Sequence, residues 1–180
     1  AALLAVPATA QSEVKFGIVG PFSGASAMNG EQWKQGIDAW LAQNGDTVNG
    51  RKIEIIYRDT ASGNPAVAKQ LSQELLVQEK IDILGGYALS PEAAGVAQLI
   101  NETKTPTLLF HVASPVLTTL SPYFVRVGQN IATNGSGAAK YALRQGKKTA
   151  FITVADYAPG KDVLKAFTET FTAGGGTIVG

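Results

Sequence analysis

The segment Ile81-Asp82-Ile83-Leu84-Gly85-Gly86-Tyr87-Ala88-Leu89-Ser90-Pro91-Glu92 is the strongest indication of the fold class. Its apolar beginning is typical of a buried strand, and the two glycines that end the strand are followed at once by a helix start. Proline suits the first position of a helix, and the serine before it is a good cap for the free N–H groups. A strand that leads directly into a helix is the building unit of sheets covered by helices.

A second serine–proline turn follows the next predicted strand. This strand covers residues 107–110 and leads into Val112-Ala113-Ser114-Pro115. The N-terminus of a helix presents backbone donors and the positive end of the helix dipole. Two such turns at neighbouring strand ends predict a site for a small polar or anionic ligand. The sequence leaves one alternative open, namely that both turns are ordinary strand-to-helix turns capped for stability.

The remaining chain continues the alternation of strands and helices. Hydrophobic periodicity predicts strands at residues 14–19, 52–57, 81–84, 107–110, 123–127, 149–154 and 177–179, and helices at 30–43, 66–78, 91–101, 135–145 and 161–173. This alternation indicates a parallel sheet covered on both faces. Ligands bind beyond the carboxyl ends of the strands in such sheets, so the turns at 21–24, 87–90 and 113–114 are expected on one rim.

The segment 129–133 is predicted to separate two lobes. Residues 11–130 are expected to form the first ligand-binding lobe, and residues 131–180 the start of a second lobe. Two strands do not make a sheet that buries itself, so the second lobe is expected to be incomplete in this chain.

Residues 1–10 are predicted to be the end of a secretory signal peptide. A short apolar run is followed by Ala8-Thr9-Ala10, which has the small–x–small pattern of a cleavage site. The mature chain is therefore expected to begin at Gln11 and to be free in the periplasm. No thiol stands after the cleavage point to accept a lipid, so no direct membrane anchor is expected.

Composition excludes several classes of protein. With 45% hydrophobic and 16% charged residues in a chain of 180, the sequence is globular rather than disordered. A net charge of +1 without clusters of Lys and Arg excludes a nucleic-acid partner. The absence of cysteine excludes a disulfide scaffold and cysteine-based metal or catalytic sites.

No catalytic motif is found either. The first turn, Gly20-Pro21-Phe22-Ser23-Gly24, lacks the glycine spacing of a dinucleotide site, and the sequence has no phosphate-binding loop and no serine elbow. His111 is the single histidine and is expected to be a rim or packing residue. Metal-ligand spacing does not occur. We therefore expect no enzyme activity, no catalytic residue, no metal and no cofactor.

Taken together, the motifs resemble those of the periplasmic ligand-binding receptors of the branched-chain amino acid (Leu/Ile/Val) type, the substrate-binding proteins of ABC transporters. The segments that carry the resemblance keep their order along the chain: Val14 to Gly24, Gly30, Tyr57-Arg58-Asp59, Gly85-Gly86-Tyr87, Ala113-Ser114-Pro115, Tyr123 to Arg126, and Asp156 to Gly160. The resemblance implies an α/β fold of the type I periplasmic-binding-protein class. In that fold parallel, Rossmann-like sheets form two lobes, which close over a ligand.

The resemblance also implies a set of ligand-binding residues on the predicted rim. Ala88, Leu89 and Ser90 would offer backbone donors and a hydroxyl to a ligand carboxylate. Ala113 and Ser114 would do the same from the neighbouring turn. Three residues complete the set: Tyr157, the aromatic of the second lobe; Tyr87, which precedes the Ala88–Ser90 turn; and Met28, in the wall formed by the first turn. The full predicted set is Tyr87, Ala88, Leu89, Ser90, Ala113, Ser114, Tyr157 and Met28. For Tyr87 a place at the edge of the core is the alternative.

The implied function is capture of a small solute and its delivery to the membrane permease of an ABC importer by a monomeric protein. Leu89 stands where receptors for amino acids usually have a small hydroxyl residue, and the acidic partner of an ammonium group would lie past Gly180. The ligand is therefore either a branched-chain amino acid or a related aliphatic or aromatic acid or amide. The alternative function is that of a periplasmic sensory or regulatory protein with the same fold.

Overall fold

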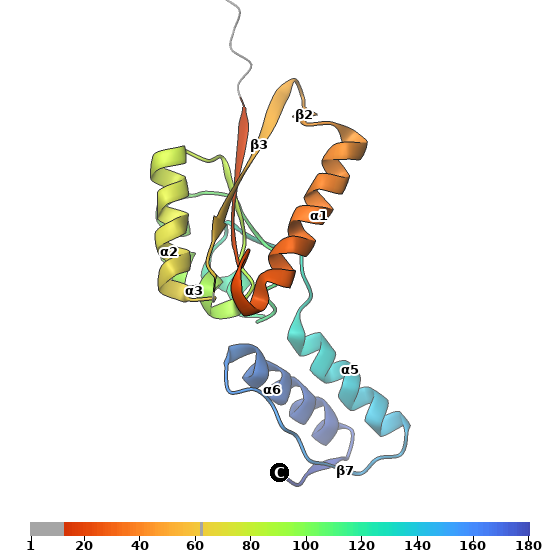
Figure 1. The fold of residues 1–180 in the computed structure, drawn as a ribbon. Helices are drawn as coiled ribbons and strands as arrows, with labels where there is room; N and C mark the ends of the chain where they lie inside the picture. Colours follow the sequence, from red (N-terminus) through yellow and green to blue (C-terminus); the bar gives the residue numbers. More distant parts are fainter. Residues whose placement is uncertain (1–12, 62) are drawn as a thin grey trace, which may run out of the picture.

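The computed structural model describes residues 13–61 and 63–180, and a six-stranded sheet forms the centre of its first part (Figure 1). The strand order is β2-β3-β1-β4-β5-β6. All neighbours pair in parallel except the hairpin of β2 with β3. The strands are β1 (Val14–Gly20), β2 (Thr47–Val48), β3 (Arg51–Asp59), β4 (Ile83–Gly86), β5 (Thr107–Leu109) and β6 (Phe124–Arg126). We call this part, up to β6, the first lobe.

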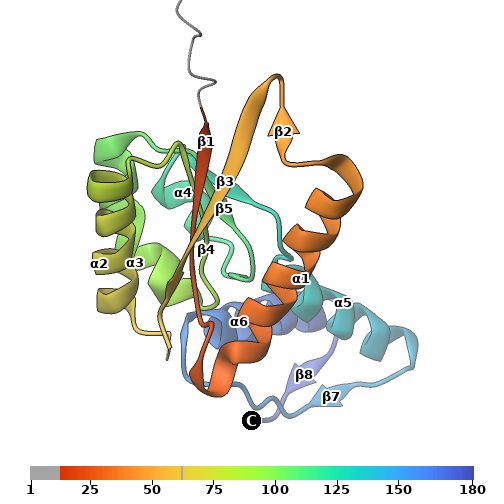
Figure 2. The same ribbon diagram turned by 45° about the horizontal axis from the view of Figure 1, so that its top comes forward.

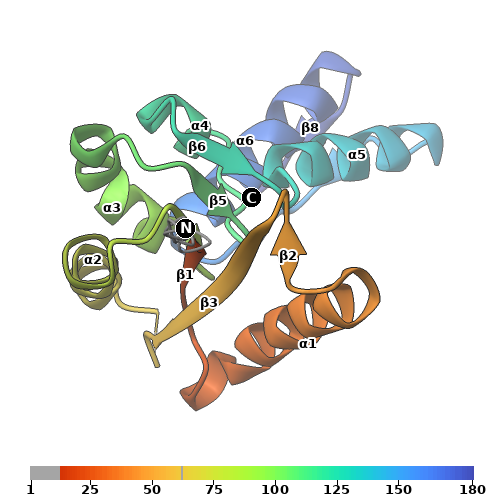
Figure 3. The same cartoon turned by 90° about the horizontal axis from the view of Figure 1, so that it is seen from above.

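Helices cover both faces of this sheet (Figure 3). One face carries α2 (Pro65–Glu74), which continues into a π-helical turn over Leu75–Glu79, together with α3 (Ser90–Thr103). The main hydrophobic core lies on this face and includes Val19, Leu84 and Ile100. A short helix, α4 (Leu117–Leu120), precedes β6.

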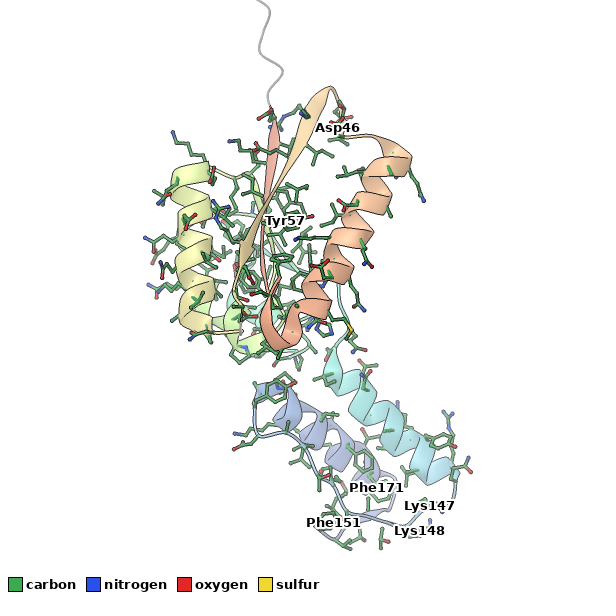
Figure 4. The ribbon with its side chains drawn as sticks, viewed as in Figure 1. Asp46, Tyr57, Lys147, Lys148, Phe151 and Phe171 are labelled. Carbon is green, nitrogen blue, oxygen red and sulfur yellow. The ribbon has the colours of Figure 1, made fainter. Side chains whose placement is uncertain are left out.

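The opposite face carries α1 (Ala27–Asn44), which packs through aromatic rings. Trp33 meets Phe110 edge to face with ring centroids 5.3 Å apart, and Phe110 meets Phe16 in the same way at 6.2 Å. Tyr57 of β3 lies against Phe22 at 5.1 Å and is labelled in Figure 4. Such pairs add about 0.5–1.5 kcal/mol each beyond the area they bury. They fix the start of α1 against the rim of the sheet.

The second lobe consists of α5 (Ile131–Arg144), β7 (Thr149–Ala150), α6 (Ala158–Ala173) and β8 (Thr177–Ile178). β7 and β8 form a separate parallel pair. The two helices approach closely at Gly135, because a Cβ there would lie 2.6 Å from the Val163 carbonyl oxygen. Phe171 of α6 is fully buried, whereas Phe151, just after β7, is 70% exposed (Figure 4).

The predicted fold class is confirmed, with differences at the ends of several elements. α1 and α5 begin at Ala27 and Ile131 rather than at residues 30 and 135, and the hairpin strand β2 was not predicted. β7 is shorter than the predicted 149–154, because β8 pairs with only two of its residues. The Ser114-Pro115 turn leads into a helix of only four residues, α4, so it does not repeat the long helix start after Ser90-Pro91. The predicted signal peptide end and Gln11 lie outside the described residues.

Candidate functional site

A pocket of about 240 Å³ lies at the carboxyl ends of the strands, where the two lobes meet. In Figures 1 and 2 these strand ends point toward the beginning of α6. The beginnings of α1 and α6, the loops after β4 and β5 and the crossover between the lobes contribute to the pocket, whereas no described residue of the β3–α2 loop lines it. The lining residues are Asn29, Ala88, Leu89, Ser90, His111, Ala113, Gln129, Ile131, Tyr157 and Pro159.

Five of the predicted ligand-binding residues come together in this pocket: Ala88, Leu89, Ser90, Ala113 and Tyr157. The other three do not line it. Met28 is 70% exposed, and its neighbour Asn29 faces the pocket instead. Tyr87 and Ser114 are buried in the first lobe. Whether any of these residues binds a ligand stays a prediction.

Sequence reasoning did not single out Gln129, Ile131 and Pro159, and it gave His111 no role in binding. His111, Gln129 and Ile131 belong to no motif of the sequence, and Pro159 lies in the segment Asp156 to Gly160, of which only Tyr157 was assigned to the site. Each, however, stands at a position that the strand pattern already marked: one after β5, two in the crossover between the lobes, and one at the start of α6. The topology of the sheet, rather than the residue type, was the available signal.

Tyr87 points away from the pocket because the chain turns sharply where β4 ends. Gly86 has a φ of +109° and Tyr87 a φ of +65°, which direct the tyrosine ring into the core. Its side chain is 0% exposed, and its hydroxyl lies 2.8 Å from Ser72 Oγ of α2. Burial raises the pKa of Tyr87 well above its ordinary value. The alternative that placed Tyr87 in the core agrees with this position.

Glu92, not Ser90, caps the N-terminus of α3, which corrects the sequence prediction. Glu92 Oε2 accepts hydrogen bonds from the backbone N–H groups of Ala88 at 3.0 Å and Leu89 at 2.9 Å. The Glu92 side chain is 0% exposed, and its second oxygen has no hydrogen-bond partner among residues 13–61 and 63–180. A carboxylate at this end of a helix is favoured by the helix dipole.

Ser90 instead holds the neighbouring rim turn. Its Oγ accepts hydrogen bonds from the backbone N–H groups of Ala113 at 3.3 Å and Ser114 at 3.2 Å. The backbone donors that were expected to face a ligand are thus used inside the protein by Glu92 and Ser90, and the expectation is corrected on this point. A serine hydroxyl accepts two hydrogen bonds and donates one. Both acceptor positions of Ser90 are occupied, so its proton remains for an acceptor in the pocket.

Ser114 directs its hydroxyl to the second lobe, where it donates a hydrogen bond to Asp162 Oδ2 of α6. The Ser114 carbonyl oxygen accepts from Arg126 Nη2, and Arg126 Nη1 donates to the Val112 carbonyl oxygen at 3.0 Å. Burial lowers the pKa of Arg126 from its ordinary value. The guanidinium of Arg126, at the end of β6, therefore holds the turn Val112–Ser114 through two of its carbonyl oxygens.

Asp59 fixes the first rim turn. Its Oδ1 accepts from the backbone N–H groups of Phe22 at 2.8 Å, Ser23 at 3.2 Å and Ala61 at 2.8 Å. Desolvation alone would raise the pKa of Asp59, but the hydrogen bonds from Ser23, Ala61 and Phe22 outweigh it and hold the pKa below its ordinary value. The turn in front of Asn29 is therefore held in one conformation.

The pocket combines polar and apolar groups. Its lining contains no Lys, Arg, Asp or Glu side chain among the described residues, and its polar groups are hydroxyl, amide and imidazole. Leu89, Ile131 and Pro159 supply apolar surface, and Tyr157 adds an aromatic ring. Over residues 13–61 and 63–180 we find neither a cluster of side chains suited to a metal ion nor a helix that could cross a membrane.

Known proteins share both sequence and fold with this chain. It is 37% identical over 176 residues to the Leu/Ile/Val-binding protein homolog 6 of Brucella abortus, an alignment that covers 98% of this chain and 45% of that protein. A solute-binding protein of an ABC transporter from Rhodopseudomonas palustris, solved with 4-hydroxybenzoate, superposes with a TM-score of 0.89 at 43% identity. One from strain HaA2 of that species, solved with p-hydroxybenzoic acid, gives 0.90 at 42%.

Each of these two structures is matched over 93% of this chain and 46% of its own length. The chain thus spans about half the length of the relatives that it matches. The family model for periplasmic binding proteins matches residues 13–180, which include both lobes and every residue of the pocket. The chain belongs to the periplasmic binding protein family.

Proposed function

We propose that the full-length protein is a periplasmic solute-binding protein that captures a small carboxylate-bearing ligand between its lobes and delivers it to the permease of an ABC importer. The observation that carries this proposal is the Ser90 hydroxyl. It lines the pocket, both of its acceptor positions are filled, and its proton is left for an acceptor on the ligand. A carboxylate oxygen is the acceptor that would form the strongest such bond.

Within this class we propose an aromatic acid with a polar ring substituent. The acidic partner that an amino acid needs for its ammonium group would lie past Gly180, so the choice of ligand class rests on the groups that line the pocket in this chain. A benzene ring suits walls made by Leu89, Ile131 and Tyr157. Asn29, His111 and Gln129 supply polar groups for a ring hydroxyl. The hydroxybenzoates seen in the two Rhodopseudomonas palustris structures have this combination of groups.

The proposal predicts that Ser90→Ala weakens binding of 4-hydroxybenzoate ten- to a hundredfold. Loss of a hydrogen bond to a charged group costs about 1.5–3 kcal/mol, which corresponds to this range of affinity. Titration calorimetry on the full-length protein measures the effect. Ser136→Ala is the matched control, because Ser136 lies within α5 and does not line the pocket, and it is expected to change the affinity less than about twofold.

Denaturant unfolding of the same variants separates binding from stability. If Ser90→Ala lowers the free energy of unfolding and leaves the affinity unchanged, Ser90 serves only the Ala113–Ser114 turn and the proposed site is wrong. If no aromatic acid binds to the unmodified protein while a branched-chain amino acid does, the proposed ligand class is wrong.

His111 is expected to discriminate between substituted and unsubstituted rings. We predict that His111→Ala weakens binding of 4-hydroxybenzoate about two- to tenfold more than binding of benzoate, since a neutral hydrogen bond contributes about 0.5–1.5 kcal/mol. His111→Gln keeps a donor and an acceptor and should restore part of the difference. Competition titrations with the two acids test this. An equal loss for both acids would show that His111 does not contact the ring substituent.

A further inference from the structure

The turn Val112–Ser114 is held by every element that surrounds it. Ser90 of α3 accepts from the N–H groups of Ala113 and Ser114, and Arg126 of β6 donates to the carbonyl oxygens of Val112 and Ser114. The middle carbonyl, that of Ala113, accepts a hydrogen bond from the backbone N–H of Ile131 at 3.0 Å. Ser114 itself is 1% exposed. All three carbonyl oxygens of the turn and the N–H groups of Ala113 and Ser114 are therefore hydrogen-bonded within the protein, and the Ser114 hydroxyl reaches outward.

That hydroxyl reaches across the interface of the lobes. It donates to the carboxylate of Asp162, which stands in the first turns of α6, 48 residues further along the chain. Apart from the crossover at residues 129–134, we find no other hydrogen bond or ion pair between the two lobes in the described parts of the chain. Asp162 has no ion-pair partner within these parts, because the nearby Lys165 pairs with Glu169 and Lys161 with Asp156.

We propose that Asp162 is a positioning residue for ligand binding, which holds the second lobe against the pocket through Ser114. Asp162 does not line the pocket, but Tyr157 and Pro159 do, and they belong to the loop and first turn from which the helix of Asp162 continues. The hydrogen bond between Ser114 and Asp162 therefore positions the pocket wall formed by Tyr157 and Pro159 relative to Ser90 and Ala113. This inference rests on the proposed function insofar as it concerns affinity, and it gives Ser114 a role between the lobes in place of a direct contact with the ligand.

The test is a double-mutant cycle on the full-length protein with 4-hydroxybenzoate as the probe. Asp162→Ala and Ser114→Ala are each expected to weaken affinity about tenfold, mainly through faster dissociation, because the wall then leaves the pocket more readily. The double variant should lose no more than either single variant, since both remove the same bond. Asp162→Asn keeps an acceptor oxygen and should stay within about threefold of the unmodified protein.

Glu169→Ala is the matched control on the same helix. Glu169 is exposed, its ion pair with Lys165 spans 4.0 Å, and no effect on affinity is expected. Additive losses in the double variant, or an unchanged affinity of Asp162→Ala, would overturn the proposal. A merely structural role of Asp162 would lower the unfolding free energy without this coupling to Ser114.

A second readout does not depend on the identity of the ligand. In small-angle X-ray scattering of the free protein, Asp162→Ala and Ser114→Ala should increase the radius of gyration equally, and the double variant no further. If no aromatic acid binds, the proposed function fails while this result still supports the contact between the lobes. If the radius is unchanged in both variants, the contact does not hold the lobes together and the inference is wrong.

Discussion

Gly86→Ala is expected to destabilise the full-length protein by about 3–5 kcal/mol, combining backbone strain with a steric clash. Gly86 has a φ of +109°, a conformation that side chains disfavour strongly. A Cβ would also lie 2.1 Å from the Val19 carbonyl oxygen, which accepts the hydrogen bond of the Tyr87 N–H. The clash is with backbone at the centre of the sheet, so no flexible side chain can move to relieve it.

Urea unfolding measures the loss, and Gly36→Ala provides the contrast. Gly36 lies within α1, and a Cβ there meets nothing within 4 Å. The exchange should therefore stabilise the protein by about 0.5–1 kcal/mol, the usual gain for Ala over Gly in a helix. A Gly86→Ala variant as stable as the unmodified protein would show that β4 does not end in the conformation described. The position of Ala88 to Ser90 at the pocket would then have to be revised.

Glu92→Ala is expected to cost about 2–4 kcal/mol, because it leaves two N–H groups at the end of α3 without an acceptor. The N–H of Ala88 is buried and that of Leu89 partly buried, and both bond to the same carboxylate oxygen. The removed side chain also leaves a cavity, since Glu92 is fully buried. Part of this cost is offset by removal of the other oxygen, which is buried and has no partner among the described residues.

Two further variants show whether the hydrogen bonds account for this effect. Glu92→Gln keeps an acceptor oxygen for the two N–H groups and should cost about 1 kcal/mol, which reflects the lost charge at the helix N-terminus. Glu102→Ala removes an exposed carboxylate from the same helix that accepts only from Gln98, and it should stay within about 0.5 kcal/mol. Equal stabilities of Glu92→Ala and Glu102→Ala in urea unfolding would contradict the assignment of Glu92 as the cap.

The sequence by itself predicted the alternation of strands and helices and the rim where the pocket lies. The apolar run before Gly85-Gly86 and the Ser90-Pro91-Glu92 start identify β4 and α3, because hydrophobic period and helix starts are local properties. Parallel strands carry their connecting turns at the same edge, so the position of Ala88, Ser90 and Ala113 around one pocket follows from the order of elements.

The hydrogen-bond partner of each polar group at the rim depends on how the elements pack in three dimensions. Ser90 has the residue type and the place of a helix cap, but Glu92 supplies the cap and the Ser90 hydroxyl turns to the next strand end. Ser114 and Asp162 lie 48 residues apart, and neither forms a local pattern that marks the other. Serine, glutamate and backbone N–H groups can form hydrogen bonds of similar strength with many different partners. The packing of β4, β5 and α6 determines which of these groups lie within hydrogen-bond distance of one another. Hydrophobic periodicity along the chain does not predict these long-range contacts.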